Sequence, residues 1–320
     1  MADTKDINKE WNSFNTEYTN EEYPIGVYYL DLPQTIMGSI RLHWHPEIEL
    51  DFVKTGSAVY NLGEESIQVD AGSAIVINEG RIHSIENKNP GSECVIISML
   101  VNIEFLFNKD GGLLSAKYKE PITGNQSLRY ALFTPDNKRG RDGIDCINAL
   151  LKSNLDKKYG YELETKSLLC NLWMQLLNIS ALERNNKISV LSILDEERVK
   201  YAISYINKMY SKPLTLDEIS ESVHLSKSEC CRCFKRATNM TPFEYLMRQR
   251  ILESARKMQR NDPIANSISE LAESVGFNNA SYYNRIFKKY FGDTPTKCKE
   301  QLKKSHRDSL SPFGISLARI

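Results

Sequence analysis

The sequence contains no apolar run close to the roughly 20 residues that a helix needs to span a bilayer. Its first 22 residues are polar and acid-rich, which is unlike the basic and then apolar start of a signal peptide. Its composition shows no bias towards disorder or collagen-like repeats. We therefore expect a cytoplasmic globular protein that does not contact a membrane, and 320 residues are enough for two domains with separate cores.

Cysteine lacks the arrangement that a disulfide framework requires. The chain has seven cysteines, an odd number without framework spacing, which fits reduced thiols in a reducing compartment. The cluster Cys230-Cys231-x-Cys233 suggests a metal or redox site. On a helix, however, Cys230 and Cys233 would lie on the buried face beside Phe234, so we interpret them as small buried hydrophobic residues.

Net charge is also absent overall, but the charges are sorted along the chain. Residues 195–320 hold 22 Lys and Arg against 15 Asp and Glu, a net charge of +7, which leaves 19 basic and 26 acidic residues, a net charge of −7, for the remainder. A basic half beside an acidic half is expected when only one half binds phosphate.

The acidic half begins with a β-like pattern from about Tyr23 to Ile103. Apolar segments at 48–53, 57–61, 66–69, 74–77 and 94–98 are separated by clusters of Gly, Asn and Pro. Many short strands at this spacing predict a barrel or double-sheet roll.

Helical periodicity follows from about Gly143 through Leu182, with one broad apolar stripe (Leu163, Leu168, Leu169, Leu172, Trp173, Leu176 and Leu177). The stripe exceeds what a lone helix can hide, so we expect it to pack on the barrel, on a second subunit, or on both. A polar break follows, and we predict a linker at 183–194. Asp195 is a suitable N-cap for a helix through Met209.

One segment of the basic half occurs twice, about fifty residues apart. Leu216 to Leu225 corresponds to Ile268 to Phe277, and both copies contain Glu-Ser-Val and close with Thr-Pro. Each copy predicts a short helix, a turn and a basic amphipathic helix, so we expect helix-turn-helix motifs at 215–237 and 267–290. Pro242 would begin a helix through Gln259, about 27 Å long at roughly 1.5 Å per residue, that joins them.

The outer faces of the two second helices carry the residue types that contact DNA: Ser228, Cys231, Arg232, Lys235, Ser281, Asn284, Arg285 and Lys288. Arginine can fork onto guanine and asparagine onto adenine in the major groove. The lysines are better suited to phosphates, which position the protein without specifying sequence. Two such helices about one DNA turn (~34 Å) apart predict a protein that binds double-stranded DNA.

Residues 195–304 resemble the DNA-binding domain of the AraC/XylS family of bacterial transcription regulators. The second copy carries the family signature, from Ile268-x-x-Leu271-Ala272 through Gly276-Phe277 to Thr294-Pro295. The resemblance implies base contacts from Ser228, Cys231, Arg232, Ser281, Asn284 and Arg285, and RNA polymerase as a partner. Three departures are Tyr283 in place of Phe, Cys298-Lys299 in place of Tyr-Arg, and the cysteines of the first recognition helix.

Residues 38–87 resemble the paired motifs of the cupin barrel, with His43-x-His45-x3-Glu49 and a later His83. In cupin enzymes the equivalents of these four residues hold a divalent metal, and three imidazoles with a carboxylate are adequate ligands. Arg41, His43 and His45 alternate, so we expect their side chains to share one face. We favour an effector pocket formed by Arg41, His43, His45, Glu49 and His83 over a bound metal, and we expect no other cofactor.

Together these patterns predict an α+β multidomain protein. We expect a cupin-like effector-binding barrel at 1–142, a helical dimerisation region at 143–182, the linker at 183–194, an AraC-type DNA-binding domain at 195–304 and a tail at 305–320. We expect a transcription regulator, an activator, and not an enzyme. It would work as a homodimer and bind a small-molecule effector, for which we expect a carbohydrate. The alternatives are a metal-dependent cupin enzyme fused to a DNA-binding module, and a thiol-responsive or architectural DNA binder.

Overall fold

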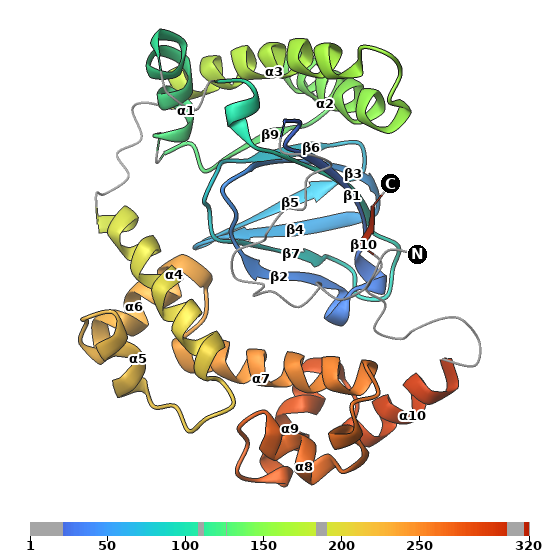
Figure 1. The fold of residues 1–320 in the computed structure, drawn as a ribbon, viewed down its shortest axis with the longest axis vertical. Coiled ribbons are helices and arrows are strands. Elements are labelled where there is room, and N and C mark those ends of the chain that lie inside the picture. Colours follow the sequence, from blue (N-terminus) through green and yellow to red (C-terminus); the bar gives the residue numbers. More distant parts are fainter. Residues whose placement is uncertain (1–21, 108–111, 126, 184–190, 306–316, 320) are drawn as a thin grey trace.

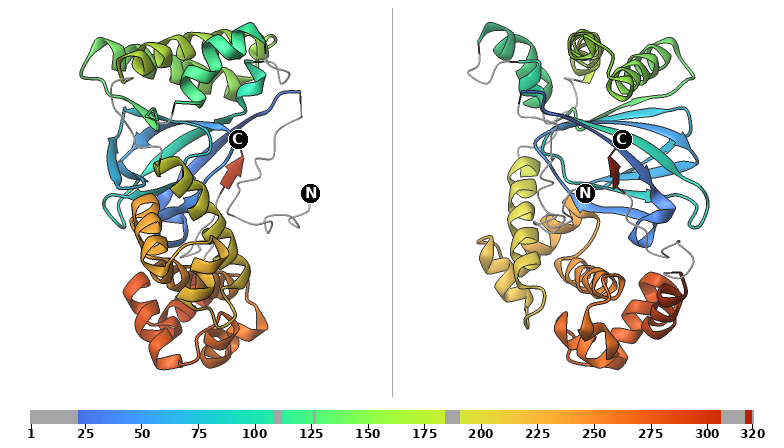
Figure 2. Two further views of the ribbon diagram at one scale, coloured as in Figure 1. Left: turned by 90° about the vertical axis from the view of Figure 1, so that its left-hand side faces the viewer. Right: turned by 45° about the vertical axis from the view of Figure 1, so that its right-hand side comes forward.

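A computed structural model describes residues 22–107, 112–125, 127–183, 191–305 and 317–319, which form a β-barrel between two helical regions (Figures 1 and 2). The strands are β1 (Ile25–Asp31), β2 (Ser39–His43), β3 (Ile48–Thr55), β4 (Ser57–Leu62), β5 (Glu65–Asp70), β6 (Ala74–Ile77), β7 (His83–Asn87), β8 (Val95–Val101), β9 (Tyr130–Phe133) and β10 (Leu317–Arg319). The five strand segments expected from the sequence are thereby confirmed.

The strands form two antiparallel sheets that face each other. One has the order β10-β1-β8-β3-β6-β9 and the other the order β2-β7-β4-β5. Side chains that alternate inward along the strands, such as Val53, Tyr60 and Ile85, fill the space between the sheets. Short 3-10 helices at Leu32–Gln34, Ile36–Gly38 and Ile103–Phe105 lie at the ends of the strands. This is the predicted barrel-like architecture.

The outer face of the six-stranded sheet is covered by α1 (Glu120–Thr123), which follows a π-helix at Ser115–Lys119, and by α2 (Lys138–Asp156) and α3 (Tyr161–Glu183) (Figure 1). The helices expected over 143–182 are thus α2, which begins five residues earlier, and α3. Lys157 adopts a left-handed conformation (φ 47°) and Gly160 another (φ 86°), which breaks the chain between them. Leu169, Leu172 and Trp173 of the expected stripe pack in one cluster with the sheet.

The C-terminal region is entirely helical within the described residues 191–305. It contains α4 (Leu191–Met209), α5 (Leu216–Ser222), α6 (Lys227–Thr238), α7 (Pro242–Gln259), a 3-10 helix (Pro263–Asn266), α8 (Ile268–Ser274), α9 (Ala280–Phe291) and α10 (Pro295–Ser305). The helix expected from Asp195 begins four residues earlier, at Leu191, so Asp195 is not its N-cap. It is instead buried inside α4, where it accepts a hydrogen bond from Arg236 of α6 at 2.6 Å. Residues 184–190 of the predicted linker and 306–316 of the predicted tail lie outside the described residues.

The two helix-turn-helix copies share their local geometry. Ser226 caps α6 by accepting from the Glu229 N–H, and Asn279 caps α9 by accepting from the Tyr282 N–H. Gly276 turns the chain between α8 and α9 with φ 92°, and His224 adopts φ 53° at the corresponding position between α5 and α6. The repeat seen in the sequence is thus a repeat in three dimensions.

Helix α7 has the predicted limits, and it connects the two copies (Figure 1). Arg250, near its middle, donates to the carbonyls of Tyr210 and Lys212 at 2.7 and 2.8 Å and lies over the Phe277 ring. Because these contacts join α4, α7 and the second copy, the helices form one unit. Among the described helices, none combines the length and apolar character required to cross a membrane.

The outer face of the four-stranded sheet packs on this helical unit. Leu42 and Ile82 belong to the same buried apolar cluster as Phe234, Leu246 and Phe287 of the C-terminal helices. Both views in Figure 2 show the barrel between the α2–α3 layer and the C-terminal helices.

Candidate functional sites

The eight residues expected to contact DNA lie on α6 and α9, the second helix of each repeat. All except Cys231 are exposed, and Cys231 is half-buried. The opposite faces of these helices bury Cys230, Cys233 and Phe234 in the first copy and Tyr283 and Phe287 in the second. Each helix therefore presents a polar, basic face to solvent and anchors itself with an apolar one, as expected from the sequence.

Two of the arginines on these faces are oriented by neighbours on their own helix. Arg232 forms an ion pair with Glu229, which also contacts Arg236 at 3.6 Å. The Arg285 guanidinium lies 5.2 Å from the centroid of the Tyr282 ring. These partners are exposed or partly exposed, so their contacts leave the arginines accessible to a ligand.

The buried cysteines behave as the sequence predicted. Burial raises the pKa of Cys230 to about 11 and that of Cys233 to about 12, where the neighbouring Asp195 adds to the effect. Both thiols are therefore protonated at neutral pH, which disfavours metal ligation and oxidation. The substitution Tyr283 is also explained, because its hydroxyl donates to Ser254 of α7 at 3.0 Å.

Inside the barrel, the structure brings together His43, His45, Glu49 and His83. Their potential ligand atoms all lie within 4.8 Å of one another, and all four side chains are buried. His43 of β2 is paired across the sheet with His83 of β7, and Glu49 reaches them from β3 in the facing sheet. Glu49 Oε2 lies 3.2 Å from His45 Nε2 and 2.8 Å from His83 Nε2.

The backbone orients the three imidazoles. His43 Nδ1 donates to the Arg41 carbonyl at 2.7 Å, His45 Nδ1 to the Glu47 carbonyl at 3.1 Å, and His83 Nδ1 to the Arg81 carbonyl at 2.8 Å. Since a carbonyl can only accept, each Nδ1 carries a proton and each Nε2 is turned towards the centre of the cluster, where those of His45 and His83 lie against the Glu49 carboxylate. The cluster thus gathers three imidazole Nε2 atoms and a carboxylate.

The electrostatics of the cluster differ between its members. Burial alone would lower the pKa of His45, but Glu49 and Glu47 override that effect and raise it. Burial, followed by the nearby His83 and His45, lowers the pKa of His43 well below its usual value. Burial alone would raise the pKa of Glu49, but His83 and His45 override that effect and hold the pKa well below its usual range. A neutral imidazole and an ionised carboxylate are the forms that bind a metal ion.

The cluster therefore fits a divalent metal ion. Its donor set, its backbone-fixed tautomers and its compactness match a site in which each ligand lies roughly 2.0–2.2 Å from a common centre. The imidazole rings are separated by only 4.1 to 5.6 Å between centroids. This spacing suits a single ion better than a sugar-sized effector.

Arg41 does not share a face with His43 and His45, so that expectation was wrong. The register of β2 shifts between Ile40 and His43, and this bulge directs the Arg41 side chain out of the barrel. Its guanidinium contacts Gln249 at 3.3 Å and Glu253 at 3.7 Å, both on α7.

Sequence reasoning missed Arg81, which makes a corresponding contact. Its guanidinium lies 3.3 Å from Glu196 of α4, and Glu196 also accepts from the Ile82 N–H at 2.9 Å. A signal was present, since Arg-Leu-His at 41–43 and Arg-Ile-His at 81–83 are the same tripeptide pattern.

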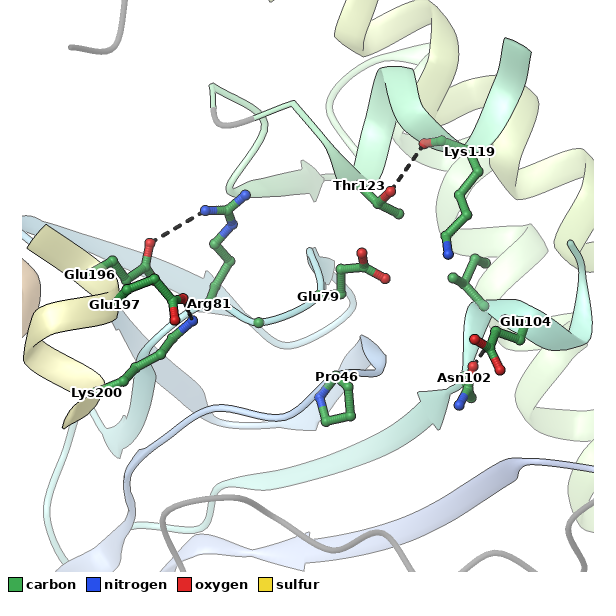
Figure 3. Close-up of a pocket in the computed structure, with 12 residues that line it drawn as sticks. Pro46, Glu79, Arg81, Asn102, Glu104, Lys119, Thr123, Glu196, Glu197 and Lys200 are labelled. Carbon is green, nitrogen blue, oxygen red and sulfur yellow. Dashed lines mark hydrogen bonds and ion pairs between the residues drawn. The ribbon is translucent and has the colours of Figure 1, made fainter. Parts of the chain in front are cut away.

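A cavity of about 390 Å³ lies beside this contact, between the barrel and α4. Figure 3 shows Glu79 near its centre, with Arg81, Glu196, Glu197 and Lys200 on one side and Lys119 and Glu104 on the other. Burial raises the pKa of Glu79. None of its described lining residues is aromatic, so the cavity offers charged and hydrogen-bonding groups to a ligand.

Comparison with known proteins agrees with both halves of the structure. Residues 219–301 match the family described as "Helix-turn-helix domain", and residues 34–100 match "Cupin domain". The uncharacterized HTH-type transcriptional regulator YdeC of Bacillus subtilis is 30% identical over 286 residues, which covers 89% of this chain and 94% of that protein. The HTH-type transcriptional activator RhaS of Pectobacterium carotovorum is 22% identical, with coverages of 84% and 91%.

Among solved structures, ToxT from Vibrio cholerae is similar with a TM-score of 0.43 and 13% identity, covering 89% of this chain and 97% of that one. The expected departures of the signature, Tyr283, Cys298 and Lys299, are accommodated within the buried core or by hydrogen bonds. The repeat, the barrel and the relatives lead to one conclusion: this chain belongs to the AraC/XylS family of HTH-type transcription regulators and joins a cupin domain to a DNA-binding domain.

Proposed function

We propose that this regulator recognises its operator through the exposed faces of α6 and α9. The observation that carries the proposal is that Arg232 and Arg285 occupy corresponding exposed positions on the two repeated helices. Ser228, Cys231, Ser281 and Asn284 would supply further base contacts, and Lys235 and Lys288 would contact phosphates.

The test is fluorescence anisotropy with the full chain and DNA from upstream of its own gene. The proposal requires binding that is stronger than to random DNA and that weakens as salt rises, because neutralised phosphates release counterions. Equal binding to both DNAs would contradict sequence recognition.

We further propose domains at 1–142, 143–182 and 195–304, with a homodimer formed through the helices that cover the barrel. The stretch that pairs two chains would begin at α2, and the outer face of α3 supports this role because Leu163 and Met174 are exposed on it.

We also propose that the protein acts in the cytoplasm and activates transcription by contacting RNA polymerase. Its similarity to RhaS, which is named a transcriptional activator, supports this proposal.

We propose that the small-molecule effector occupies the cavity between the barrel and α4. Its volume of about 390 Å³ is large enough for a small metabolite. The dense charged and amide groups suit a carbohydrate or a similarly polar molecule. Because the cavity is lined by both domains, an occupant would change how they pack. Direct effector contacts from Arg41, His43, His45, Glu49 and His83 remain a prediction.

The effector proposal is tested by thermal shift and calorimetry with a panel of sugars, sugar acids and amino acids. Glu79→Gln would weaken binding of the active compound, whereas Glu86→Gln, outside the cavity, would leave it unchanged. An effect of both substitutions, or of neither, would place the effector elsewhere.

We propose no catalytic activity for this chain. The cupin enzyme alternative keeps a specific observation in its favour, namely the three-histidine and one-carboxylate cluster. That cluster is buried, which supports a sensing or structural ion over one that exchanges substrate. Turnover of a small substrate by purified, metal-loaded protein would restore the enzyme hypothesis.

A further inference from the structure

The two Arg–apolar–His tripeptides each join the inside of the barrel to the DNA-binding domain. In Arg41-Leu42-His43 and in Arg81-Ile82-His83, the histidine points into the buried cluster and donates through Nδ1 to the carbonyl of the arginine two residues earlier. The same arginine extends its guanidinium in the opposite direction, to α7 or to α4. One residue therefore contacts both the cluster and the other domain.

The central residue of each tripeptide strengthens this connection. Leu42 and Ile82 are 5% and 0% exposed and lie in the apolar cluster formed mainly by the DNA-binding domain. The Ile82 N–H donates to Glu196, the partner of Arg81. A shift of either tripeptide would thus disturb apolar packing, an ion pair and a hydrogen bond at the domain boundary together.

The cluster itself provides the force that could shift them. One potential ligand atom from each of the three histidines and from Glu49 lies within 4.8 Å of the others, and a divalent cation would attract all four. Ligands drawn to a common centre fix the ring positions and so fix the carbonyls of Arg41 and Arg81. Without the cation, Glu49 contacts His45 and His83 at 3.2 and 2.8 Å but does not bind the four groups to one centre, so the geometry is less constrained.

We propose that a divalent transition-metal ion, held by His43, His45, Glu49 and His83, regulates DNA binding by controlling how the barrel docks on the DNA-binding domain through Arg41 and Arg81. Imidazole and carboxylate ligands suit Zn²⁺, Ni²⁺, Co²⁺, Fe²⁺ or Mn²⁺. This inference rests on the proposed function, because its test measures the affinity for operator DNA. It adds an ion as a second regulatory ligand beside the effector.

The structure offers a matched control. Glu86 of β7 forms another ion pair across the same boundary, with Arg248 of α7 at 3.7 Å. Glu86 belongs to the strand of His83, but its side chain is not the partner of either arginine that orients an imidazole. A variant at Glu86 removes a contact between the domains while leaving both tripeptides intact.

The experiment uses the full chain, stripped with a chelator and then loaded with Zn²⁺, Co²⁺, Ni²⁺ or Mn²⁺ one at a time. Calorimetry gives the stoichiometry, and anisotropy gives the affinity for upstream DNA with and without the ion. We expect one ion per chain, and a change in DNA affinity of about fivefold or more, the usual range of coupling between two sites. His83→Ala should lose both.

The double variant Arg41→Met, Arg81→Met keeps the aliphatic stems and removes both guanidinium groups. It should still bind one ion, but the ion should change its DNA affinity by less than about twofold. Glu86→Gln should retain the wild-type change. Equal effects of the ion on the wild type and the double variant would overturn the proposed route, and absence of stoichiometric binding would overturn the site.

Reciprocity allows a test without any variant. If the ion changes DNA affinity by some factor, operator DNA must change ion affinity by the same factor. Wild-type protein that binds DNA selectively but shows no such linkage would contradict the inference while leaving the DNA-binding proposal intact. Protein that binds the ion but no DNA would contradict the proposed operator contacts instead.

Discussion

Arg285 and Lys288 lie one turn apart on the exposed face of α9, yet their expected roles differ. Arginine recognises a base edge through two parallel hydrogen bonds, whereas lysine supplies a point charge to phosphate. Arg285→Ala should weaken specific binding by roughly 1–3 kcal/mol and relax the preference at one base pair. Lys288→Ala should weaken binding to all sequences and reduce the salt slope by about one.

These outcomes are measured by anisotropy on operator variants at several salt concentrations. Arg260→Ala, an exposed arginine at the end of α7, is the control and should leave base preference unchanged. If Arg285→Ala changed only the salt slope, the assignment of Arg285 to base recognition would be wrong.

The cysteines make a second prediction at this scale. Cys170 is exposed on α3, whereas burial raises the pKa of Cys230 to about 11 and that of Cys233 to about 12. Iodoacetamide at pH 7–8 should therefore label Cys170 first and leave Cys230 and Cys233 unmodified until the domain unfolds. Peptide mass mapping gives the order.

Early labelling of Cys233 would instead indicate an accessible thiolate and support a thiol-responsive regulator. In that case Cys231→Ser would also be expected to abolish any response of DNA binding to oxidant. A response to oxidant that persists in that variant would exclude a role for Cys231.

At the scale of elements, capping boxes fix where the helices of the first repeat region begin. The Thr241 hydroxyl accepts from the Glu244 N–H while Glu244 accepts from the Thr241 N–H, and Thr215 with Glu218 repeats the arrangement. Thr241→Ala should lower the stability of α7 by about 1 kcal/mol. Hydrogen exchange of the α7 amides should accelerate accordingly, while Thr296→Ala, exposed on α10, should leave it unchanged.

Helix α3 carries the prediction about assembly. Most of its apolar residues pack on the barrel, but Leu163 and Met174 are 76% and 57% exposed. Met174→Glu should convert a dimer into a chain of 36.7 kDa, as measured by light scattering after size exclusion. Tyr201→Glu, on exposed α4 surface, should leave the mass unchanged. A monomeric wild type at micromolar concentration would refute dimerisation through α3.

The elements with strong periodicity and explicit end signals could be predicted from the sequence. Pro242 and Gln259 bound α7 as expected, because proline at the first turn and the Asn261-Asp262-Pro263 break are local signals. The limit between α2 and α3 was not predicted, because the apolar stripe at 163–177 lies wholly within α3 and gives no signal for the end of α2. Only the conformations of Lys157 and Gly160, which no pattern requires, reveal the break.

At the scale of the molecule, the sequence identified the site residues better than their arrangement. The histidines and Glu49 meet because cupin strands fix their register, but Arg41 was misplaced since a bulge interrupts the alternation of β2. Docking of Leu42 and Ile82 on the helices could not be foreseen either, because an apolar residue facing outwards on a barrel looks the same whatever covers it.

The central claim is that the two helix-turn-helix motifs of one chain place α6 and α9 in successive major grooves. Hydroxyl-radical footprinting of the full chain on its upstream DNA tests it most directly. We expect two protected patches on one face of the duplex, about one turn (~34 Å) apart, with Arg232→Ala weakening one and Arg285→Ala the other. A single patch, patches on opposite faces, or uniform protection would contradict the account.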